Sequence, residues 1–369
     1  MLQKIFATGA ILCATLTAFP QVASVSEPIN TPSATMPTAA PEPEKKPFLT
    51  ISGGADLYFR YDANKKVANN HTSFTNTHSD FALGMASLKL EHTGGKVGFV
   101  ADLGFGQRAK EFAYTDEGIV SAIKQLYITY APTDWLKFTA GSWATHIGYE
   151  LVDAPLNRNY SMSYLFTNGP FTHTGLKAEL TKGKHGLMVG ISNATDYRTP
   201  PSGTMNKKFL IAQYSLAATE KVKLYLNYVG GQGPDTAKTN QVDAVVTATL
   251  SKKIGIALNG SLYQTKQWDG SKNIEAKKWW GTALYLTADL QDWFALALRS
   301  ELFNDKEGLK GFGSSIVAHT FSANFKVDGF TFIPEVRIES SKDNLFYDKT
   351  GFVSKKGDVS FLLAAIYKF

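Results

Sequence analysis

Apolar and polar residues alternate with a period of two in many short segments between residues 48 and 369. In LTISGGADLYFRY (49–61), the odd positions from Leu49 to Tyr61 are apolar or small, and most even positions from Thr50 to Arg60 are polar. Such a pattern predicts a strand with one apolar and one polar face. The same pattern returns in KVGFVADLGFG, WLKFTAGSW, KVKLYLNYV, IGIALNGSLY, WFALALRSELF and FTFIPEVRIES.

The connections between these segments alternate in length. Turn-rich links such as HTGGK, APTDW, TKGKHG and QDW are short, whereas the links at 62–79, 107–118, 144–172, 194–206, 230–240, 264–277, 304–311 and 341–357 are long. This alternation is typical of up-and-down barrels with short periplasmic turns and long outer loops. We therefore predict an all-β fold, a transmembrane antiparallel up-and-down β-barrel of about 16 strands, with fourteen or eighteen as near alternatives. The uncertain hairpin is 81–92, where the alternation breaks near Ser87.

We expect the sheet to close on itself, because backbone groups inside a lipid bilayer must find their hydrogen-bond partners within the protein. Aromatic residues gather near the ends of the predicted strands, as interfacial girdles require. The last segment, VSFLLAAIYKF, ends the chain on an aromatic residue, Phe369. An even strand number places both ends of the barrel in the periplasm. The periplasmic girdle is predicted at Trp135, Phe138, Trp293, Phe294, Phe332, Tyr367 and Phe369, and the outer one at Phe59, Tyr61, Phe105, Tyr228 and Trp280.

Three domains are predicted. Residues 1–25 have a positive start at Lys4, an apolar core too short to span a bilayer and small residues after it, which indicates a secretory signal peptide. Residues 26–47 are rich in proline and small residues and predict an extended periplasmic linker. Residues 48–369 form the barrel. The one cysteine, Cys13, lies in the signal peptide, so the mature chain has no thiol.

The composition of the chain supports a membrane barrel and limits the classes of molecule that it is expected to bind. Charged residues make up only 19% of the chain, which is lean for a soluble protein. Removing Lys4 from the 38 basic residues leaves 37 against 32 acidic ones, a net charge of +5. No basic run forms a nucleic-acid patch. The predicted partners are outer membrane lipid and small hydrophilic solutes, the predicted location is the bacterial outer membrane, and a homotrimer is one assembly option.

The longest connection contains NRNYSMSYLFTNGPF (157–171), which follows no helical period. We expect its large side chains Tyr160, Tyr164, Leu165, Phe166 and Phe171 to anchor the loop on the barrel wall while Glu150, Asp153 and Arg158 reach into water. Two alternatives are open: the loop folds inward as a constriction, or it caps the barrel from outside. The pore-lining and constriction candidates are Arg60, Asp102, Glu150, Asp153, Arg158, Arg299, Glu301, Glu335 and Arg337. Facing charges of this kind either screen solutes through a transverse field or form a structural ion-pair network.

A specific resemblance appears in the same region. GSWATHIGYELVDAPLNRNYSMSYLFTNGPFTHTG resembles the corresponding part of the putative beta-barrel porin 2 family of OmpL-like outer membrane proteins. The shared residues are Gly148, Tyr149, Glu150, Asn159, Tyr160, Ser161, Pro170 and Gly175. Met162 stands where the family usually has Arg, so a basic side chain is missing at that point. The resemblance implies a barrel over 48–369 with a porin role and no defined solute.

Enzymatic barrels are the rival class. The seven histidines are scattered, and no GxSxG, HExxH or P-loop pattern occurs. His146 and His173 flank the long loop and are the one pair able to meet, but a polar loop histidine is the more frequent explanation. We therefore predict no catalytic residue, no metal and no cofactor. The expected function is an outer membrane porin, a water-filled channel for passive diffusion of small hydrophilic solutes or ions. The alternatives are an outer membrane barrel enzyme or a substrate-specific channel.

Overall fold

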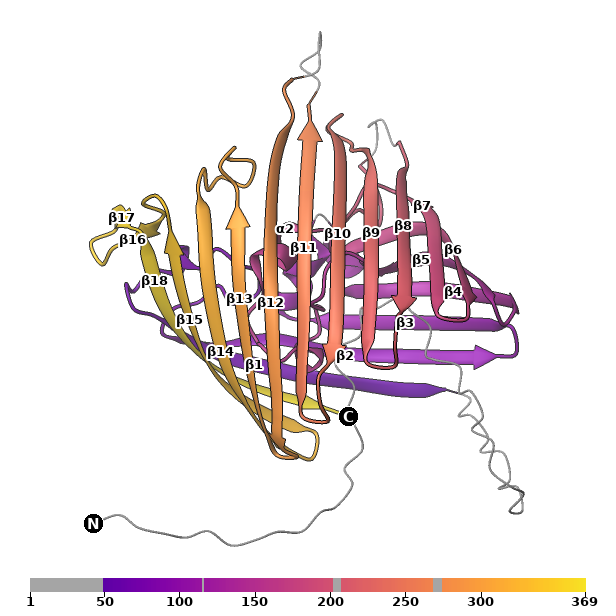
Figure 1. Cartoon of the computed structure of the whole chain (residues 1–369), viewed down its shortest axis with the longest axis horizontal. Coiled ribbons are helices and arrows are strands. Elements are labelled where there is room, and N and C mark those ends of the chain that lie inside the picture. The colour runs from indigo at the N-terminus through magenta and orange to yellow at the C-terminus, as the bar shows by residue number, and fades with distance from the viewer. Residues whose placement is uncertain (1–48, 115, 202–206, 268–273) are drawn as a thin grey trace, which may run out of the picture.

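Sixteen antiparallel strands form a closed barrel in the computed structural model, which describes residues 49–114, 116–201, 207–267 and 274–369 (Figure 1). The strand number and the all-β class predicted from the alternation are confirmed. The wall strands are β1 (Thr50–Asp62), β2 (Asp80–Gly94), β3 (Val97–Phe105), β4 (Ile123–Thr133), β5 (Leu136–Ala144), β6 (Thr172–Lys182), β7 (His185–Ser192), β8 (Phe209–Ala217), β9 (Val222–Gln232), β10 (Lys238–Thr249), β11 (Ile254–Lys266), β12 (Lys277–Gln291), β13 (Phe294–Asn304), β14 (Ser315–Val327), β15 (Phe330–Ser341) and β18 (Gly357–Lys368).

The barrel closes where its first strand meets its last. β1 pairs with β18 in a register that runs from Gly54 opposite Lys368 to Asp62 opposite Ser360. The backbone N–H of Gly53 donates to the carbonyl of Phe369, and the N–H of Phe369 donates to the carbonyl of Gly53. Every other wall strand pairs with its neighbour in the chain, which is the up-and-down order that the alternating connections predict.

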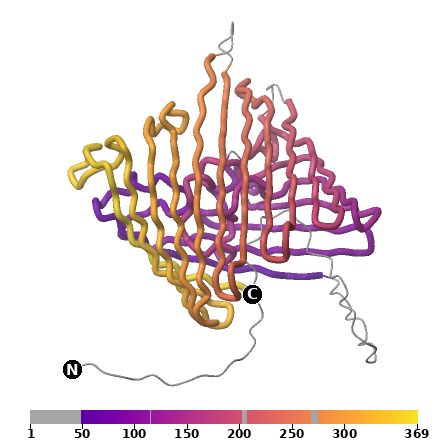
Figure 2. Tube along the Cα trace, viewed as in Figure 1, coloured from indigo at the N-terminus to yellow at the C-terminus, as the bar shows by residue number. Residues whose placement is uncertain are grey.

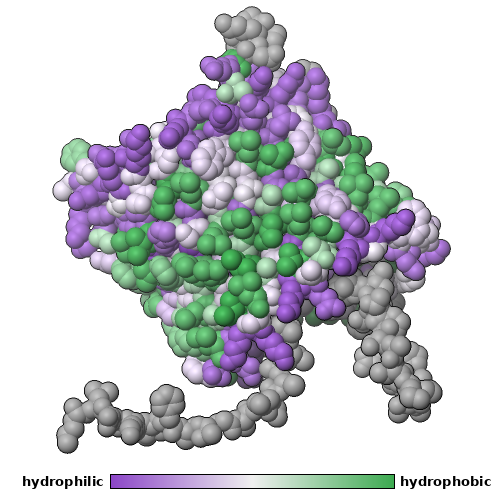
Figure 3. All heavy atoms as spheres, viewed as in Figure 1, coloured by the Kyte–Doolittle hydropathy of each residue, from purple (hydrophilic) through white to green (hydrophobic). Residues whose placement is uncertain are grey.

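The period of two sorts the side chains between lipid and lumen. In β13, Ala295, Ala297 and Arg299 are buried inside the barrel, whereas Leu296 on the other face is exposed. Figure 3 shows the result on one side of the molecule, where apolar residues cover the middle of the wall and hydrophilic ones gather toward its ends. Exposed aromatics lie near the strand ends, at Trp135, Trp293, Phe332, Tyr367 and Phe369 on the short-turn side and at Phe105 and Trp280 on the other.

The irregular hairpin is a bulge in β2. The register between β1 and β2 shifts between Ala55 and Leu57, so the extra residues lie near Gly84 and Met85, earlier than the predicted break at Ser87. The Asp56 carboxylate accepts a hydrogen bond from the Met85 backbone N–H at 3.2 Å, which stabilises the bulge. A side chain at position 84 would collide with the Asp56 carboxylate and the Tyr160 hydroxyl, so glycine is required there.

The long connections have structure of their own. They contain the helices α1 (Gln107–Ala113) and α2 (Tyr164–Asn168), three short 3-10 turns (Val67–Asn69, Gly118–Ala122 and Ala154–Leu156), and a small hairpin of β16 (Phe346–Tyr347) and β17 (Val353–Lys355). None of these elements was expected from the sequence. The long link predicted at 230–240 is wrong, because β9 and β10 extend into it and a tight turn joins them, with the Gly233 N–H bonded to the Ala237 carbonyl.

Figure 2 traces the indigo and magenta first half of the chain behind the orange strands, where β1 to β5 form the far wall of the barrel. In the part of the chain that the structure describes, no helix is long and apolar enough to cross a membrane. The predicted signal peptide and the whole of the predicted linker lie outside the described residues. The domain boundaries therefore stay predictions.

Candidate functional site: a loop bound inside the barrel

The connection between β5 and β6, residues 145–171, is called loop 3 here, and it lies inside the barrel. Its first residues turn inward along the opposite strands: the His146 ring nitrogen Nε2 lies 3.0 Å from the Tyr228 carbonyl on β9. Two residues on, the Gly148 N–H donates to Asp243 of β10 at 3.0 Å. Gly148 adopts φ of +90°, a conformation that suits glycine and gives the loop its turn.

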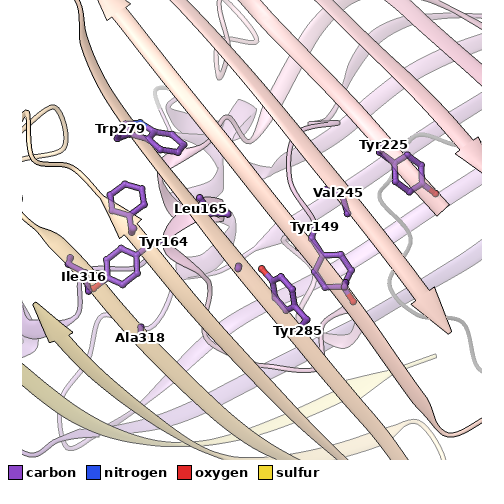
Figure 4. Packing of buried hydrophobic residues seen from close by; sticks show 12 residues of the cluster. Tyr149, Tyr164, Leu165, Tyr225, Val245, Trp279, Tyr285, Ile316 and Ala318 are labelled. Atoms are coloured by element: carbon purple, nitrogen blue, oxygen red, sulfur yellow. The ribbon is translucent and has the colours of Figure 1, made fainter. Parts of the chain in front are cut away.

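Loop 3 next packs on the apolar part of the inner wall. Tyr149 lies against Tyr285 of β12 with ring centres 4.3 Å apart. Tyr164 stacks on Phe303 of β13 at 5.5 Å. Figure 4 shows Tyr149, Tyr164 and Leu165 of loop 3 beside the strands that carry Trp279, Tyr285 and Ile316. This packing buries an apolar cluster inside the lumen, so loop 3 is fixed to the wall by the hydrophobic effect as well as by polar contacts.

Arg299 on β13 is the centre of the polar contacts. Its guanidinium donates to Glu150 at 2.7 Å, to Glu301 at 3.0 Å and to the backbone carbonyls of Ser161 and Met162. The side chain is fully buried. A planar guanidinium with five N–H donors suits such a position, since it can bind two carboxylates and two carbonyls at once.

Carboxylates of the wall accept hydrogen bonds from the loop backbone. Glu335 of β15 accepts from the N–H groups of Tyr160 and Ser161 at 2.8 and 3.2 Å. Glu301 accepts from the N–H of Tyr164 at 2.7 Å. A loop inside a barrel has no sheet partners, so its buried N–H groups need other acceptors. The inward acids of β13 and β15 provide them.

A second arginine joins loop 3 to the two loops before it. Arg108, on α1, is fully buried, and its guanidinium carbon lies 5.0 Å from the Phe74 ring centre and 4.7 Å from that of Tyr160. It also lies 3.7 Å from Asp56. Around it, side chains from three connections form one apolar cluster within the lumen: Phe74, Phe112, Val152, Met162, Phe166 and Phe171.

The helix α2 lies in the segment that has no helical period in its sequence. It is a single turn, and the Ser163 hydroxyl caps it by accepting from the Phe166 N–H at 3.0 Å. A serine at this position stabilises a helix start because it binds an N–H group that has no partner within the helix. Contacts made elsewhere in the barrel hold the rest of the turn, which explains why local sequence gave no signal.

The remaining loop charges are paired as well. Asp153 contacts the Lys124 ammonium of β4, which also lies 3.0 Å from Asp102. Arg158 pairs with Asp289 of β12 at 2.9 Å. The expectation that Glu150, Asp153 and Arg158 reach freely into water is therefore wrong, because each has an oppositely charged partner on the wall. The anchoring of Tyr160, Tyr164 and Leu165 to the wall is confirmed, whereas Phe166 and Phe171 pack mainly on the neighbouring loops.

The structure brings most of the sequence-predicted site residues together. One network joins Glu150, Arg299, Glu301 and Arg337, with Arg337 3.3 Å from Glu301. Asp102 and Asp153 share Lys124, and Glu335 binds the loop backbone. Arg60 stands apart, paired with Asp62 near the closing seam. Sequence reasoning missed Lys124 and Asp289 as partners. Lys124 sits at the register shift between Asp102 and Leu103, where the alternation that marks inward residues fails.

Two parts of the wall differ in how loop 3 covers them. We call the inner face of β13 to β15 the sealed wall, where the side chains of Arg299, Glu301, Arg337 and Glu339 are 0 to 4% exposed. We call the inner face of β2, β5 and β6 the open wall. There the Lys137–Glu179 pair, 3.0 Å apart, is 31% and 13% exposed, and Lys89–Glu91, 2.9 Å apart, is 32% and 41% exposed.

His146 at the start of loop 3 and His173 just after its end do meet. Their ring centres lie 5.0 Å apart, and both side chains are buried. The Nε2 atom of His173 lies 3.0 Å from the Thr145 hydroxyl. Burial lowers the pKa of His146 to about 4, with its contact to the Tyr228 carbonyl opposing the shift. Among the described residues, no group of three or more His, Cys, Asp or Glu side chains is arranged to hold a metal ion.

A comparison with protein families assigns this sixteen-stranded barrel to a family. The sequence profile described as Putative beta-barrel porin-2, OmpL-like, matches residues 48–369. The chain belongs to this family. The resemblance inferred from the loop 3 residues is thereby confirmed. No curated protein matches the chain in sequence.

Solved porins share the fold. The anion-selective porin from Comamonas acidovorans is 13% identical and superimposes with a TM-score of 0.56 over 87% of this chain and 99% of its own. The outer membrane channel DcaP of Acinetobacter baumannii is 12% identical and superimposes with a TM-score of 0.57 over 87% of this chain and 97% of its own. OmpT of Vibrio cholerae in its trimer form is 9% identical and superimposes with a TM-score of 0.56 over 87% of this chain and 99% of its own. With the family, these structures make the protein an outer membrane porin channel, and they suggest a channel rather than an enzyme.

Proposed function

We propose that this porin passes small hydrophilic solutes and ions by passive diffusion, and that loop 3 is its constriction. The observation that carries the proposal is the fixation of loop 3 to the sealed wall by Arg299 and Glu335, beside an open wall whose charged pairs remain in contact with water. A solute that passes loop 3 then travels along the open wall. Polar and charged linings of this kind favour hydrated solutes over apolar ones.

The predicted pore-lining residues take two roles in this proposal. The candidates on the sealed wall and on loop 3 shape the constriction, because their charges are paired with each other or with the loop backbone. Asp102 adjoins the open wall through β2, where it lies opposite Lys89, and contributes to the field along the solute path. The proposal therefore combines the two alternatives, a structural ion-pair network on one side and a screening field on the other.

Catalysis by the buried histidines is not part of this proposal. His146 and His173 lie against a backbone carbonyl and a threonine hydroxyl, which are contacts of structural histidines, and no serine or carboxylate is bonded to either ring among the described residues. The one hydroxyl in contact with a ring, that of Thr145, is buried together with His173, whereas a nucleophile and its base must both be open to the substrate.

We further propose a homotrimer. Support comes from the trimer form of the Vibrio cholerae OmpT barrel and from an apolar hollow of about 620 Å³ on the outer face of the wall, lined among others by Leu296, Phe321 and Phe361. Native mass spectrometry of the detergent-extracted protein measures the assembly directly, and a single-chain mass in mild detergent contradicts this proposal.

The constriction is tested by deletion of residues 157–168 and single-channel recording in planar bilayers. We expect a larger open-state conductance, because the deletion removes the segment bonded to Glu335 and Arg299. The matched control shortens the exposed β16–β17 hairpin at residues 348–351 and should leave the conductance unchanged. Heat-modifiable migration shows that each barrel is folded. A folded loop 3 deletion with wild-type conductance contradicts the constriction, whereas conductance that saturates with one solute favours the substrate-specific alternative.

A further inference from the structure

A cavity of about 190 Å³ remains between the end of loop 3 and the inner face of β8 to β11. Aromatic rings and polar groups share its lining, including Tyr114, Tyr197, Tyr263, Gln241, Asp196 and Lys310. Tyr114 is 58% exposed, so the cavity is open toward the loop end of the barrel. None of the pore-lining candidates discussed above borders it.

Tyr263 offers a rigid aromatic surface. Its ring stacks on Trp279, with centres 5.6 Å apart and planes 6° from parallel. Trp279 itself is fully buried. A ring held in this way loses little conformational freedom when a ligand packs on it, and a ligand on the face under Lys310 requires that flexible side chain to move aside.

Lys310 supplies a positive donor beside that ring. Its ammonium nitrogen lies 5.7 Å from the Tyr263 ring centre, and no carboxylate oxygen among the described residues lies within 4.0 Å of it. The backbone N–H of Lys310 donates to Asp305 at 3.0 Å, which fixes the loop that carries it. Burial lowers the pKa of Lys310, while Asp196 and Asp305 oppose the shift.

Asp196 balances this charge. It accepts hydrogen bonds from the N–H groups of Phe171 and Thr172 at 2.7 and 2.9 Å, at the point where loop 3 joins β6. Burial raises the pKa of Asp196 to about 6, with those two N–H groups opposing the shift. An anionic ligand would lie near Asp196 and a cationic ligand near Lys310. The lining therefore favours a neutral ligand with polar edges.

The volume sets the size of that ligand. Pockets for drug-sized molecules span roughly 300 to 1,000 Å³, so this cavity suits a single ring. A pyranose has apolar C–H faces, which pack on a tyrosine ring, and hydroxyl edges, which bind ammonium and amide groups. We propose that the cavity between loop 3 and β8 to β11 is a binding site for a neutral monosaccharide. This rests on the proposed function, because such a site lies on the entry path of the diffusion channel.

Isothermal titration calorimetry of the detergent-purified barrel with D-glucose tests the site without requiring conduction. We expect saturable binding, weakened roughly tenfold by Lys310→Met, which removes a charged hydrogen bond, and by Tyr263→Ala, which removes the stacking surface. Tyr263→Phe keeps the ring and should bind nearly as well as wild type. Lys306→Met is the matched control, since Lys306 is exposed on the same connection and does not border the cavity.

The outcomes separate the two proposals. Absence of glucose binding, or binding that Lys310→Met and Tyr263→Ala leave unchanged in folded barrels, overturns the site. Acetate binding that depends on Lys310, without glucose binding, overturns it in favour of an anion site. Conductance in bilayers is measured on the same preparations. Glucose binding in a barrel that conducts no ions supports the site and contradicts the diffusion function, whereas normal conductance without binding does the reverse.

Discussion

The sealed wall and the open wall carry the same kinds of side chain in different surroundings. Both present acids and bases at inward positions of neighbouring strands, for example Arg299 and Glu301 on β13 and Lys137 opposite Glu179 on β5 and β6. On the sealed wall, the loop backbone completes the coordination of these charges and excludes water. On the open wall, whose pairs lie nearer the periplasmic turns, water remains. The covering by loop 3, rather than strand sequence alone, decides whether an inward charge acts as an anchor or as part of a conducting surface.

The largest effect is expected from Arg299→Met, which removes the donor shared by Glu150 and Glu301. Glu150 then loses its charged partner and Glu301 keeps only Arg337, and breaking a buried pair from one side costs about 3 to 5 kcal/mol. We expect a loss of that size in the free energy of unfolding, measured by denaturant titration in detergent, together with raised and noisier conductance as loop 3 loosens. Adding Glu150→Gln should restore part of the stability, because it removes one of the unpaired charges.

Lys137→Met on the open wall is the matched control. Its pair with Glu179 is partly hydrated, so the loss should stay under about 1 kcal/mol. Ion preference should instead shift toward cations, because a positive charge leaves the wet surface. Equal destabilisation by Lys137→Met and Arg299→Met would remove the distinction between the two walls.

A smaller effect, confined to acid pH, is expected at the start of loop 3. The pKa of His146 is about 4 in the folded barrel, below the ordinary 6.5. The unfolded chain therefore takes up this proton first, and stability present above pH 6.5 is lost as pH falls toward 4. The loss at pH 4.5 is roughly 2 to 3 kcal/mol. The charged neighbour of His146 is Lys177, whereas the His173 ring beside it has a pKa that burial lowers well below 6.5.

His146→Gln keeps a donor for the Tyr228 carbonyl and removes the titration. Between pH 7 and pH 4.5, the variant should lose less unfolding free energy than wild type by about that amount. The two pH profiles are compared by denaturant titration. Parallel profiles would mean that His146 does not titrate differently in the folded and unfolded states.

The alternation of residues predicted the wall, its strand number and which charges face inward, because each of these depends on a period of two and on lipid outside. The path of loop 3 was not predictable in this way. Tyr160 binds Glu335, 175 residues further along the chain, and the Tyr164 N–H at the start of α2 binds Glu301 of β13. Asp196 and Lys310 lie in connections without alternation, so their approach to one cavity appears only in three dimensions.

The partners of Tyr160 also bear on the order in which the barrel is assembled. Its hydroxyl donates to Asp56 on the first strand, and its N–H donates to Glu335 on a strand near the end of the chain. These contacts join segments that are far apart in the sequence. Bringing such segments together costs loop-closure entropy, which makes these contacts slow to form. A nascent chain that lacks β15 and β18 has neither a closed sheet nor the acceptor for this tyrosine. Insertion of the loop and closure of the seam therefore depend on the same late segments, so both are completed at the end of assembly.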